Sequence, residues 1–465
     1  RSYRPSSRRG AGGGPGRAGA FAYRKAMALF GRRKTIEPDV AEPVQDHSLP
    51  APPRNTPEGL RTMLDHRDYV LSLVEPLPPF GMQLLDAWDL ALCEDIHAHD
   101  ALPRFDTARL DGFAVRAEDV AGASPESPRT IVVTGHLGIG DTPMAEVSTG
   151  QAVRVAAGAP VPRGADAVLP AEFAGGPDPE LRVHEPVEAG EYVRPMASEV
   201  AEGDLLAQSG QRLDARSIGL LAAAGMDKVL VRPRPRIVVM SIGSELIEAG
   251  REANVPGPVH DANSWMIAAA AKAEGAQVWR VSGIPDDPAE IREAIADQLI
   301  RADLVITTGG IGGGPSDVLP AVVAELGRVD VADVAMHPGR RNGFALIGED
   351  DVPLLMLPGN PLSAYISFEA FGRPIIRKLM GASPVTPQAI RCFASSTIRG
   401  TLGRLEFARV IVRDAGGRRM VELVNGHGSH QISQLTKANA LALIGEEVDL
   451  VNAGEPVMVW LLDQD

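Results

Sequence analysis

Four acidic residues stand where the chain is expected to turn sharply, and carboxylates at turns can gather around one ligand. They are Asp111, Glu172, Asp261 and Asp317, each beside a glycine or the end of an apolar run. Mg²⁺ bound between two phosphates takes one or two carboxylates and keeps several waters. Acids converging from several loops would suit that ion, whereas any one of them alone is more typical of a solvated side chain or a turn former.

A glycine-rich segment and a capped helix start could hold the phosphates themselves. The segment from Thr307 to Gly314 follows an apolar run and contains Gly309, Gly310, Gly312, Gly313 and Gly314. Glycines let backbone N–H groups approach an anion, and a following helix adds the positive end of its dipole. The same pattern is also typical of a tight packing turn, and it matches neither the P-loop nor the dinucleotide fingerprint. Asn360 and Pro361 open a further helix and place Ser363 in its first turn, where a phosphate could rest.

The apolar runs around these residues predict a doubly wound α/β domain over residues 234–381. Four short runs are typical of buried parallel strands: Ile237–Met240, Val278–Val281, Asp303–Ile306 and Leu354–Leu357. Helical segments alternate with them, one opened by a capping box at Asp287 to Glu290. In such sheets ligands bind beyond the carboxyl ends of the strands. The glycine segment, Asp261 and Ser363 all fall in those loops.

The remaining chain predicts an α/β multi-domain protein. We expect a disordered basic arm and linker over 1–57, and an elongated helical connecting domain over 58–104 plus 194–233. A small β-rich inserted domain is predicted over 105–193, and a C-terminal β-barrel-like domain over 382–465. Within these parts we expect helices over Gly59–Val74, Gln83–Leu92 and Asp214–Ala224, and a tight hairpin turn over Asp414–Gly417.

Composition restricts the class of partner. The net charge is −14, yet the first 36 residues carry ten basic and no acidic residues, which leaves about −24 on the rest (36 basic minus 60 acidic). The body is therefore not a nucleic-acid binder by charge. The arm is expected to be disordered and is given no function, and Met27 could be the true start. No apolar run is long enough for a membrane span, and two cysteines favour a reducing compartment, so a cytoplasmic location is predicted.

At the motifs above, the chain resembles the molybdopterin molybdenumtransferases (MoeA) and the E domain of gephyrin. The segments that carry the resemblance are Asp111–Arg116, Ala157–Val168, Ser241–Leu246, His260–Asn263, Thr308–Gly310, Pro338–Gly339 and Leu357–Ser363. It runs in order from about Thr56 to the C-terminus. The resemblance implies a four-part elongated homodimer whose α/β domain binds adenylylated molybdopterin (molybdopterin-AMP). It also implies an acidic cleft shared between subunits, where molybdate and Mg²⁺ bind before molybdate is transferred to the dithiolene and AMP is released.

Residue roles follow from the same resemblance. It places Asp111, Asp261 and Asp317 on metal or molybdate, with Asp261 and Asp317 as the metal ligands. It places the loop Gly309–Gly314, Arg340 and Ser363 on the nucleotide and phosphates.

The chain also departs from the family pattern, mostly by losing charge. Ser198 stands where a cleft glutamate is usual, Ile242 and Ser244 replace a threonine and an aspartate, and His337 and Arg340 replace two lysines. Losing one electrostatic contact of this kind typically costs ~3 to 4 kcal/mol of transition-state stabilisation. Weakened transfer is one expectation. The alternative is a catalytically degenerate, gephyrin-like dimeric scaffold that holds a partner peptide, such as a receptor tail or a tubulin-like cell-division protein.

Overall fold

The computed structural model describes residues 49–56, 58–142, 146–252, 257–314, 317–424 and 432–462. The described residues all belong to one unit, Leu49–Asp465. The predicted basic arm and most of its linker lie outside them. No helix within the described ranges is long and apolar enough to cross a membrane.

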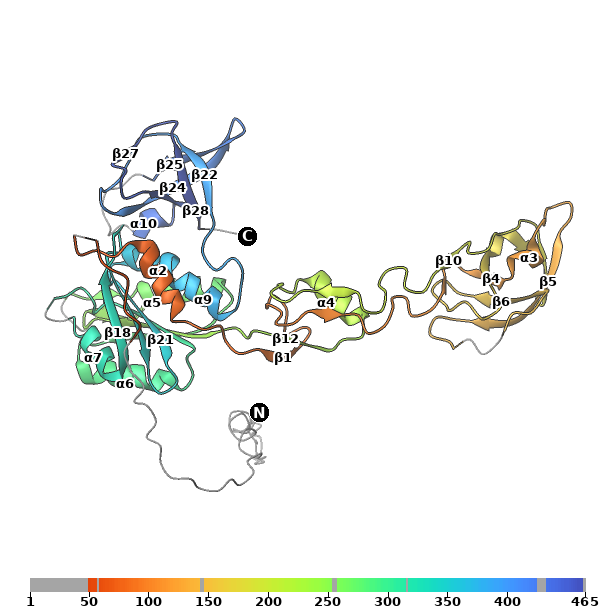
Figure 1. Ribbon diagram of the computed structural model, residues 1–465, viewed down its shortest axis with the longest axis horizontal. Helices are drawn as coiled ribbons and strands as arrows, with labels where there is room; N and C mark the ends of the chain where they lie inside the picture. Colours follow the sequence, from red (N-terminus) through yellow and green to blue (C-terminus); the bar gives the residue numbers. More distant parts are fainter. Residues whose placement is uncertain are drawn as a thin grey trace, which may run out of the picture. The chain divides into compact units, whose positions relative to one another are not determined.

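The α/β domain is built, among the described residues, on a six-stranded sheet (Figure 1). Its strands, in spatial order, are β16 (Gln277–Ile284), β13 (Arg236–Ile242), β17 (Leu304–Thr308), β21 (Val352–Leu357), β20 (Arg341–Ile347) and β18 (Gly327–Asp333). The first four are parallel, and β20 and β18 complete the sheet in antiparallel order. The chain passes from β13 to β16 on one side and then to β17 on the other side. The switch point of this sheet therefore lies between β13 and β17.

Alternate residues of β13 enter two different cores, so the sheet is covered on both faces. Ile237 and Val239 pack with α5, α8 and α9, whereas Val238 and Met240 pack with α6 and α7. The helices are α5 (Asn263–Ala273), α6 (Pro288–Leu299), α7 (Leu319–Leu326), α8 (Pro361–Ser367) and α9 (Arg373–Leu379), with a π-helical turn at Phe368–Gly372 between the last two. This arrangement leaves the loops after the parallel strands as the open end of the domain.

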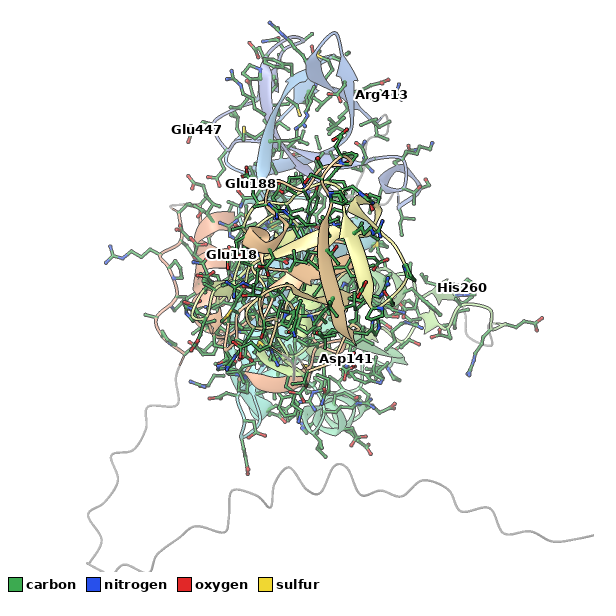
Figure 2. The ribbon with its side chains drawn as sticks, turned by 90° about the vertical axis from the view of Figure 1, so that its right-hand side faces the viewer. Glu118, Asp141, Glu188, His260, Arg413 and Glu447 are labelled. Atoms are coloured by element: carbon green, nitrogen blue, oxygen red, sulfur yellow. The ribbon has the colours of Figure 1, made fainter. Side chains whose placement is uncertain are left out.

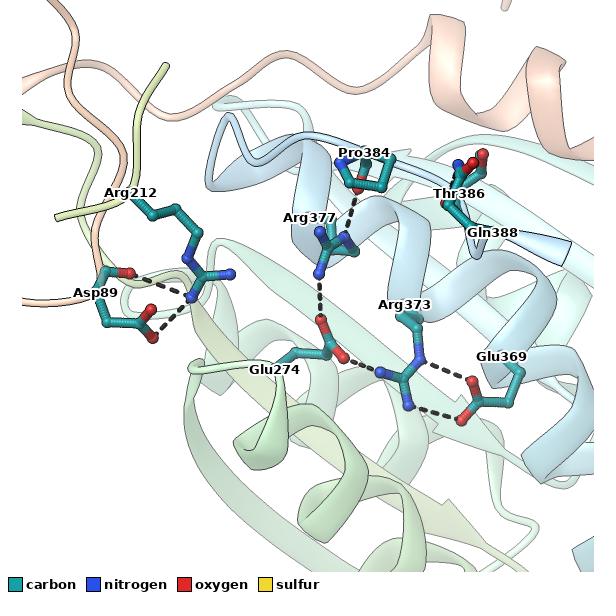
Figure 3. Close-up of polar contacts among 9 residues, drawn as sticks. All are labelled: Asp89, Arg212, Glu274, Glu369, Arg373, Arg377, Pro384, Thr386 and Gln388. Atoms are coloured by element: carbon teal, nitrogen blue, oxygen red, sulfur yellow. Dashed lines mark hydrogen bonds and ion pairs between the residues drawn. The ribbon is translucent and has the colours of Figure 1, made fainter. Parts of the chain in front are cut away.

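A partly buried ion-pair network fixes the π-helical turn (Figure 3). Glu369 accepts two hydrogen bonds from Arg373, at 2.7 and 3.0 Å, and Arg373 also pairs with Glu274 at the end of α5. Arg377 donates to Glu274 at 3.2 Å and to the carbonyl of Pro384 at 2.6 Å. Burial raises the pKa of Glu369 to about 8, while the Arg373 fork acts in the opposite direction by stabilising the ionised carboxylate. The network ties α5 to α9 and to the segment that leads into the C-terminal part.

The connecting region is made by two passes of the chain. Outgoing strands pair with returning ones in antiparallel order: β1 (Phe80–Gln83) with β12 (Lys228–Val231), β2 (Ile96–His97) with β11 (Leu205–Ala207), and β3 (Thr107–Ala108) with β10 (Val193–Arg194). Two predicted helices are present, as α2 (Met63–Ser72) and α4 (Ala215–Ala223). The helix predicted over Gln83–Leu92 is wrong. Turns follow β1 there, and Asp89 has a positive φ of 62° that interrupts any helix.

The inserted β part has a sheet of its own, six-stranded within the described residues. Its order is β7 (Ala167–Pro170), β4 (Gly112–Val115), β6 (Gln151–Val155), β5 (Arg129–Leu137), β9 (Glu180–Val183) and β8 (Ala174–Gly175), with the short helix α3 (Ala117–Val120) packed on it. The four residues of β4 are all buried. Asp111 comes directly before this strand, which lies between β7 and β6, and it is therefore held at the end of an interior strand of a well-packed sheet.

The C-terminal part closes into a five-stranded β-barrel among the described residues. The ring runs β24 (Leu405–Ala415), β25 (Arg418–Leu423), β22 (Ala389–Ala394), β28 (Pro456–Leu461) and β26 (Ala440–Ile444), which pairs back with β24. The predicted hairpin turn joins β24 to β25. Outside the ring, β23 (Ile398–Arg399) pairs with β27 (Leu450–Val451), and α10 (Ile432–Leu435) precedes β26. A short strand of the α/β domain, β19 (Met336–His337), adds to β24 in parallel, so the two domains share backbone hydrogen bonds.

Candidate functional site

Three strand ends converge at the switch point, and Gly309 is the residue that lets them do so. Its N–H donates to the Leu357 carbonyl at 3.2 Å, which joins the loops after β17 and β21. Gly309 has a φ of +90°, and a Cβ there would stand 2.3 Å from the Ile242 carbonyl oxygen at the end of β13. Gly359, in the loop after β21, also lies close to Gly309. A Cβ added to Gly359 would stand 3.4 Å from the Gly309 Cα. We call this meeting point of the loops after β13, β17 and β21 the crest.

Asp317 closes the glycine segment on itself. Its Oδ2 accepts from the Gly314 N–H at 2.6 Å, and its own N–H donates to the Gly314 carbonyl at 3.1 Å. The side chain is neither buried nor fully exposed, and it stands just before α7. Asp317 therefore presents a partly exposed carboxylate at the crest.

Asp261 is placed quite differently, because it is buried with a relative exposure of 3%. Its Oδ2 accepts from the Ser241 hydroxyl at 2.6 Å and from the Ser264 hydroxyl, and its Oδ1 accepts from the Ser264 N–H at 3.0 Å. These bonds connect the end of β13 to the first turn of α5. His260, the preceding residue, ends the short strand β15 (Val259–His260) and is exposed (Figure 2). Both oxygens of Asp261 are thus engaged within the protein.

Several buried polar atoms of this domain have no hydrogen-bond partner within the described ranges. They include Asn263 Oδ1, Thr307 Oγ1, Thr308 Oγ1, Asn342 Oδ1 and Ser367 Oγ. Thr307 and Thr308 end β17, and Asn263 opens α5 while donating to the Gly359 carbonyl at 2.7 Å. Buried polar atoms in native proteins are usually satisfied by the protein, water or a ligand. The crest thus has unused hydrogen-bonding capacity.

The cations near the crest are arranged in a way that sequence reasoning did not foresee. Arg340 is exposed and pairs with Asp333 at 2.7 Å. Arg341 also pairs with Asp333, at 3.6 Å, but it is the one that lies beside the glycine segment. Its Nη1 is 3.8 Å from the ideal Cβ position of Gly313, and its buried Nε has no partner among the described residues. Adjacent arginines look equivalent in a sequence, and the contact with a loop far along the chain distinguishes them.

His337 and Ser363 lie close to the same segment of backbone around Gly339. His337 Nδ1 lies 3.0 Å from both carboxylate oxygens of Glu406 on β24, and hydrogen bonding to Glu406 raises the pKa of this histidine. Ser363 is buried in the first turn of α8, and its N–H donates to Asn360 Oδ1 at 3.3 Å. Its carbonyl oxygen lies 3.4 Å from the ideal Cβ of Gly339. The predicted helix start at Asn360 is present.

A cavity of about 540 Å³ adjoins this domain at the edge strand β16. Arg280 lines it, lies over the Trp265 ring at 3.7 Å, and donates to Glu248 at 3.1 Å and to the Ser264 hydroxyl at 2.9 Å. The Ser282 hydroxyl also donates to Glu248 and lowers the pKa of that carboxyl. Sequence reasoning missed the cluster around Arg280 and Glu248. Its only signal in the sequence is a charged residue, Arg280, within an apolar strand.

Asp111 and Glu172 belong to the inserted β part and therefore to a different sheet from Asp261 and Asp317. Asp111 is exposed, and its Oδ1 accepts from the Ala157 N–H at 2.8 Å. Glu172 is exposed in a 3₁₀ turn after β7. Among the described residues, no three or more His, Cys, Asp or Glu side chains form a group that could hold a metal ion.

Comparison with known proteins identifies the family. Three sequence profiles match in order: the MoeA N-terminal region (domains I and II) at 61–225, a probable molybdopterin binding domain at 238–378, and the MoeA C-terminal region (domain IV) at 394–462. The chain belongs to the MoeA family. Its relatives include molybdopterin molybdenumtransferase 1 of Mycobacterium tuberculosis, 36% identical over 83% of this chain and 95% of that protein. Molybdopterin molybdenumtransferase 2 of the same species is 33% identical over 86% of this chain and 99% of that protein.

A solved structure supports the same assignment. The MoeA protein of Pyrococcus horikoshii superposes with a TM-score of 0.74, at 27% identity, over 87% of this chain and 100% of that one. Within the MoeA family layout, the crest falls in the probable molybdopterin binding domain and Asp111 in the N-terminal region. The family fold predicted from the sequence is confirmed, together with a place in molybdenum cofactor biosynthesis.

Proposed function

We propose that this protein transfers molybdate onto the dithiolene of adenylylated molybdopterin in an Mg²⁺-dependent reaction that releases AMP. The observation that carries the proposal is the crest. It lies at the switch point of the sheet, in the segment that matches a molybdopterin binding domain, and it contains buried polar atoms without partners. Ligands of doubly wound sheets bind at such a point.

The crest offers separate groups for the phosphates. Backbone N–H groups of Gly309–Gly314 and the first turn of α8 at Ser363 can donate to phosphate oxygens, and Arg340 remains the proposed cation of the nucleotide. The position of Arg341 beside Gly313 adds a second arginine to that role. A guanidinium presents a planar fork of donors, so it suits two oxygens of one phosphate rather than a single close contact.

Of the two proposed Mg²⁺ ligands, Asp317 fits the ion as it stands and Asp261 does not. Asp317 suits the ion, because its carboxylate is partly exposed and Mg²⁺ needs only one or two carboxylates when substrate phosphates complete its shell. Asp261 is proposed as the second ligand, but it would have to give up the hydrogen bond from Ser241 or Ser264 to bind a metal. When bound, the ion would neutralise charge on the phosphates.

Asp111 is proposed to act on molybdate from a second subunit. It belongs to the sheet of the inserted β part and not to the crest. A homodimer in which the β part of one subunit faces the α/β domain of its partner would bring Asp111 to the reaction. This arrangement is the cleft that the family resemblance implies.

Calorimetric titration with adenylylated molybdopterin, with and without Mg²⁺, tests the proposed site. We expect micromolar binding that Mg²⁺ strengthens. Asp317→Asn should weaken the Mg²⁺-dependent part about 10-fold or more, because an amide cannot balance the cation. Asp350→Asn, a change of the same kind at an exposed loop position, should leave binding unchanged. No binding by the wild type up to millimolar ligand would argue against the proposal.

One observation favours the alternative of a scaffold without catalysis. The residues at both family lysine positions are engaged by acids of this chain, His337 by Glu406 and Arg340 by Asp333. Charges neutralised in this way are less available to a substrate. In that case the dimer would serve to hold a partner peptide, such as a receptor tail or a tubulin-like cell-division protein.

Variants at these two positions separate the two functions. If the site is degenerate, His337→Lys with Arg340→Lys should raise binding of adenylylated molybdopterin, since a lysine is a compact donor suited to phosphate. If the protein is a working enzyme that uses arginine, Arg340→Lys should weaken it. If the wild type transfers molybdate at the full rate and Asp261→Asn abolishes the transfer, the protein cannot be a scaffold alone.

A further inference from the structure

A second cavity, of about 710 Å³, lies where the connecting region meets the inserted β part, at the β3–β10 pair. Its lining residues are Thr107, Ala108, Arg109, Gly158, Arg194, Ser198 and Glu199. Two of these are arginines and one is a glutamate, so the formal charge of the lining is +1 (two minus one). The chain as a whole carries −14. A cationic cavity in so acidic a protein favours an anionic occupant, because the surrounding acids repel anions elsewhere on the surface.

Of the two arginines that line the cavity, one is paired with an acid and the other is not paired with any described residue. Arg194 pairs with Glu199, Nη2 to Oε2, at 2.6 Å. The guanidinium of Arg109 has no hydrogen bond or ion pair with any described residue, although its backbone N–H donates to the Tyr192 carbonyl at 2.8 Å and fixes its position. Arg194 pairs with Thr107 at the start of β3, and Arg109 follows the end of β3 beside Tyr192. The two arginines therefore stand at opposite ends of this short strand pair, and because side chains two residues apart along a strand share a face, they lie on the same face of it. One guanidinium is therefore unpaired among the described residues, and the other is held by an acid that a competing anion could displace.

Two hydroxyls in the lining can add hydrogen bonds. Thr107 is more than nine-tenths buried, and its hydroxyl bonds no described residue. Ser198 follows Ala197, whose φ of +61° places it in the left-handed region, where a non-glycine residue costs on the order of 1 kcal/mol. Strained residues of this kind gather at binding sites. Where the family has a glutamate, Ser198 contributes no negative charge.

We propose that this cavity binds a tetrahedral oxyanion, held by Arg109 and Arg194 with the hydroxyls of Thr107 and Ser198, and that Glu199 competes with the oxyanion for Arg194. The inference rests on the proposed function for the identity of the oxyanion, which is molybdate. Two guanidinium groups and two hydroxyls match the charge and donor needs of a dianion. Molybdate would thus be held on the inserted β part, apart from the crest that holds the nucleotide.

Molybdate binding to the full-length protein, measured by calorimetry without any other substrate, tests the site. We expect Arg109→Gln and Arg194→Gln each to weaken binding about 10-fold or more. Glu199→Gln should strengthen it several-fold, because it releases Arg194 and removes a like charge. Arg182→Gln, on the exposed side of β9, is the matched control and should have no effect. The opposite signs of the Glu199 and Arg194 variants cannot arise from general loss of folding.

Competing anions and a second readout complete the test. Tungstate should displace molybdate at similar concentrations, and displacement by phosphate or sulfate would show that the site takes tetrahedral dianions generally. In the AMP-release reaction, Arg109→Gln should raise the KM for molybdate about 10-fold while the affinity for adenylylated molybdopterin stays unchanged. Molybdate-dependent AMP release that is unaffected by Arg109→Gln and Arg194→Gln would overturn this inference but leave the proposed function standing. If the wild type binds molybdate and these variants do not, but the wild type releases no AMP, the inference would stand and the proposed function would fall.

Discussion

His66 is a buried titratable side chain that connects the first helix to the α/β domain. Arg61 Nη1 lies 3.0 Å from its Nδ1, and the ring packs edge-on against Phe371 with centroids 4.9 Å apart. Arg61 in turn forms a buried ion pair with Asp330 on β18 at 2.6 Å. Burial, and secondly the Arg61 charge, lowers the pKa of His66 from 6.5 to about 4. The neutral imidazole is therefore the form that the folded protein requires.

This residue predicts a loss of stability in mild acid. Well above pH 6.5 the histidine is neutral in both folded and unfolded chains. Between pH 6.5 and about 4 only the unfolded chain takes up the proton, so stability falls as the pH falls. The pKa difference corresponds to roughly 3 kcal/mol. Denaturant unfolding from pH 7 to 4 should show this loss, and His66→Gln should remove most of it. The same change at exposed His99 should keep the pH dependence, and an unchanged slope in His66→Gln would refute the assignment.

At the scale of elements, the crest depends on glycine at one point. Gly309→Ala adds a Cβ 2.3 Å from the Ile242 carbonyl oxygen, in addition to the strain of a positive φ. Gly203→Ala is the matched control, since it has a φ of +88° but open space around the new Cβ. We expect the control to lose on the order of 1 kcal/mol. Gly309→Ala should lose clearly more and should also lose ligand binding, measured by thermal unfolding and calorimetry. Equal losses in the two variants would contradict the geometry of the crest.

The elements also show what a sequence can and cannot indicate. The four parallel strands were predictable, because short apolar runs ended by glycine or proline are typical of buried strands. The helix predicted over Gln83–Leu92 failed, since Leu84, Ala87 and Leu90 recur at helical spacing but are buried within turns. At the site, the glycine segment and Asn360 were found from local signals. Arg341 and Arg280 were not, because their roles depend on residues separate from them in the sequence: Arg341 lies beside Gly313, and Arg280 contacts Glu248 and the first turn of α5.

For the whole molecule, we expect a homodimer. Asp111 precedes a strand of the inserted β part and the crest belongs to the α/β domain, and the proposed cleft brings these two parts together from two copies of the chain. Three large apolar side chains, Val259, Trp265 and Trp279, are also exposed around α5 and β16. Light scattering at micromolar concentration should give about twice the chain mass of 49.1 kDa. A mass equal to that of one chain would rule out the shared cleft.

The most direct measurement is AMP release from adenylylated molybdopterin by the purified protein, followed with Mg²⁺ and increasing molybdate. AMP should appear only when both Mg²⁺ and molybdate are present, in proportion to the molybdenum transferred. The rate should be below that of a relative that keeps the two family lysines, because His337 and Arg340 are engaged by Glu406 and Asp333. Failure to release AMP at any molybdate concentration, under conditions in which such a relative does so, would contradict the proposed transfer reaction.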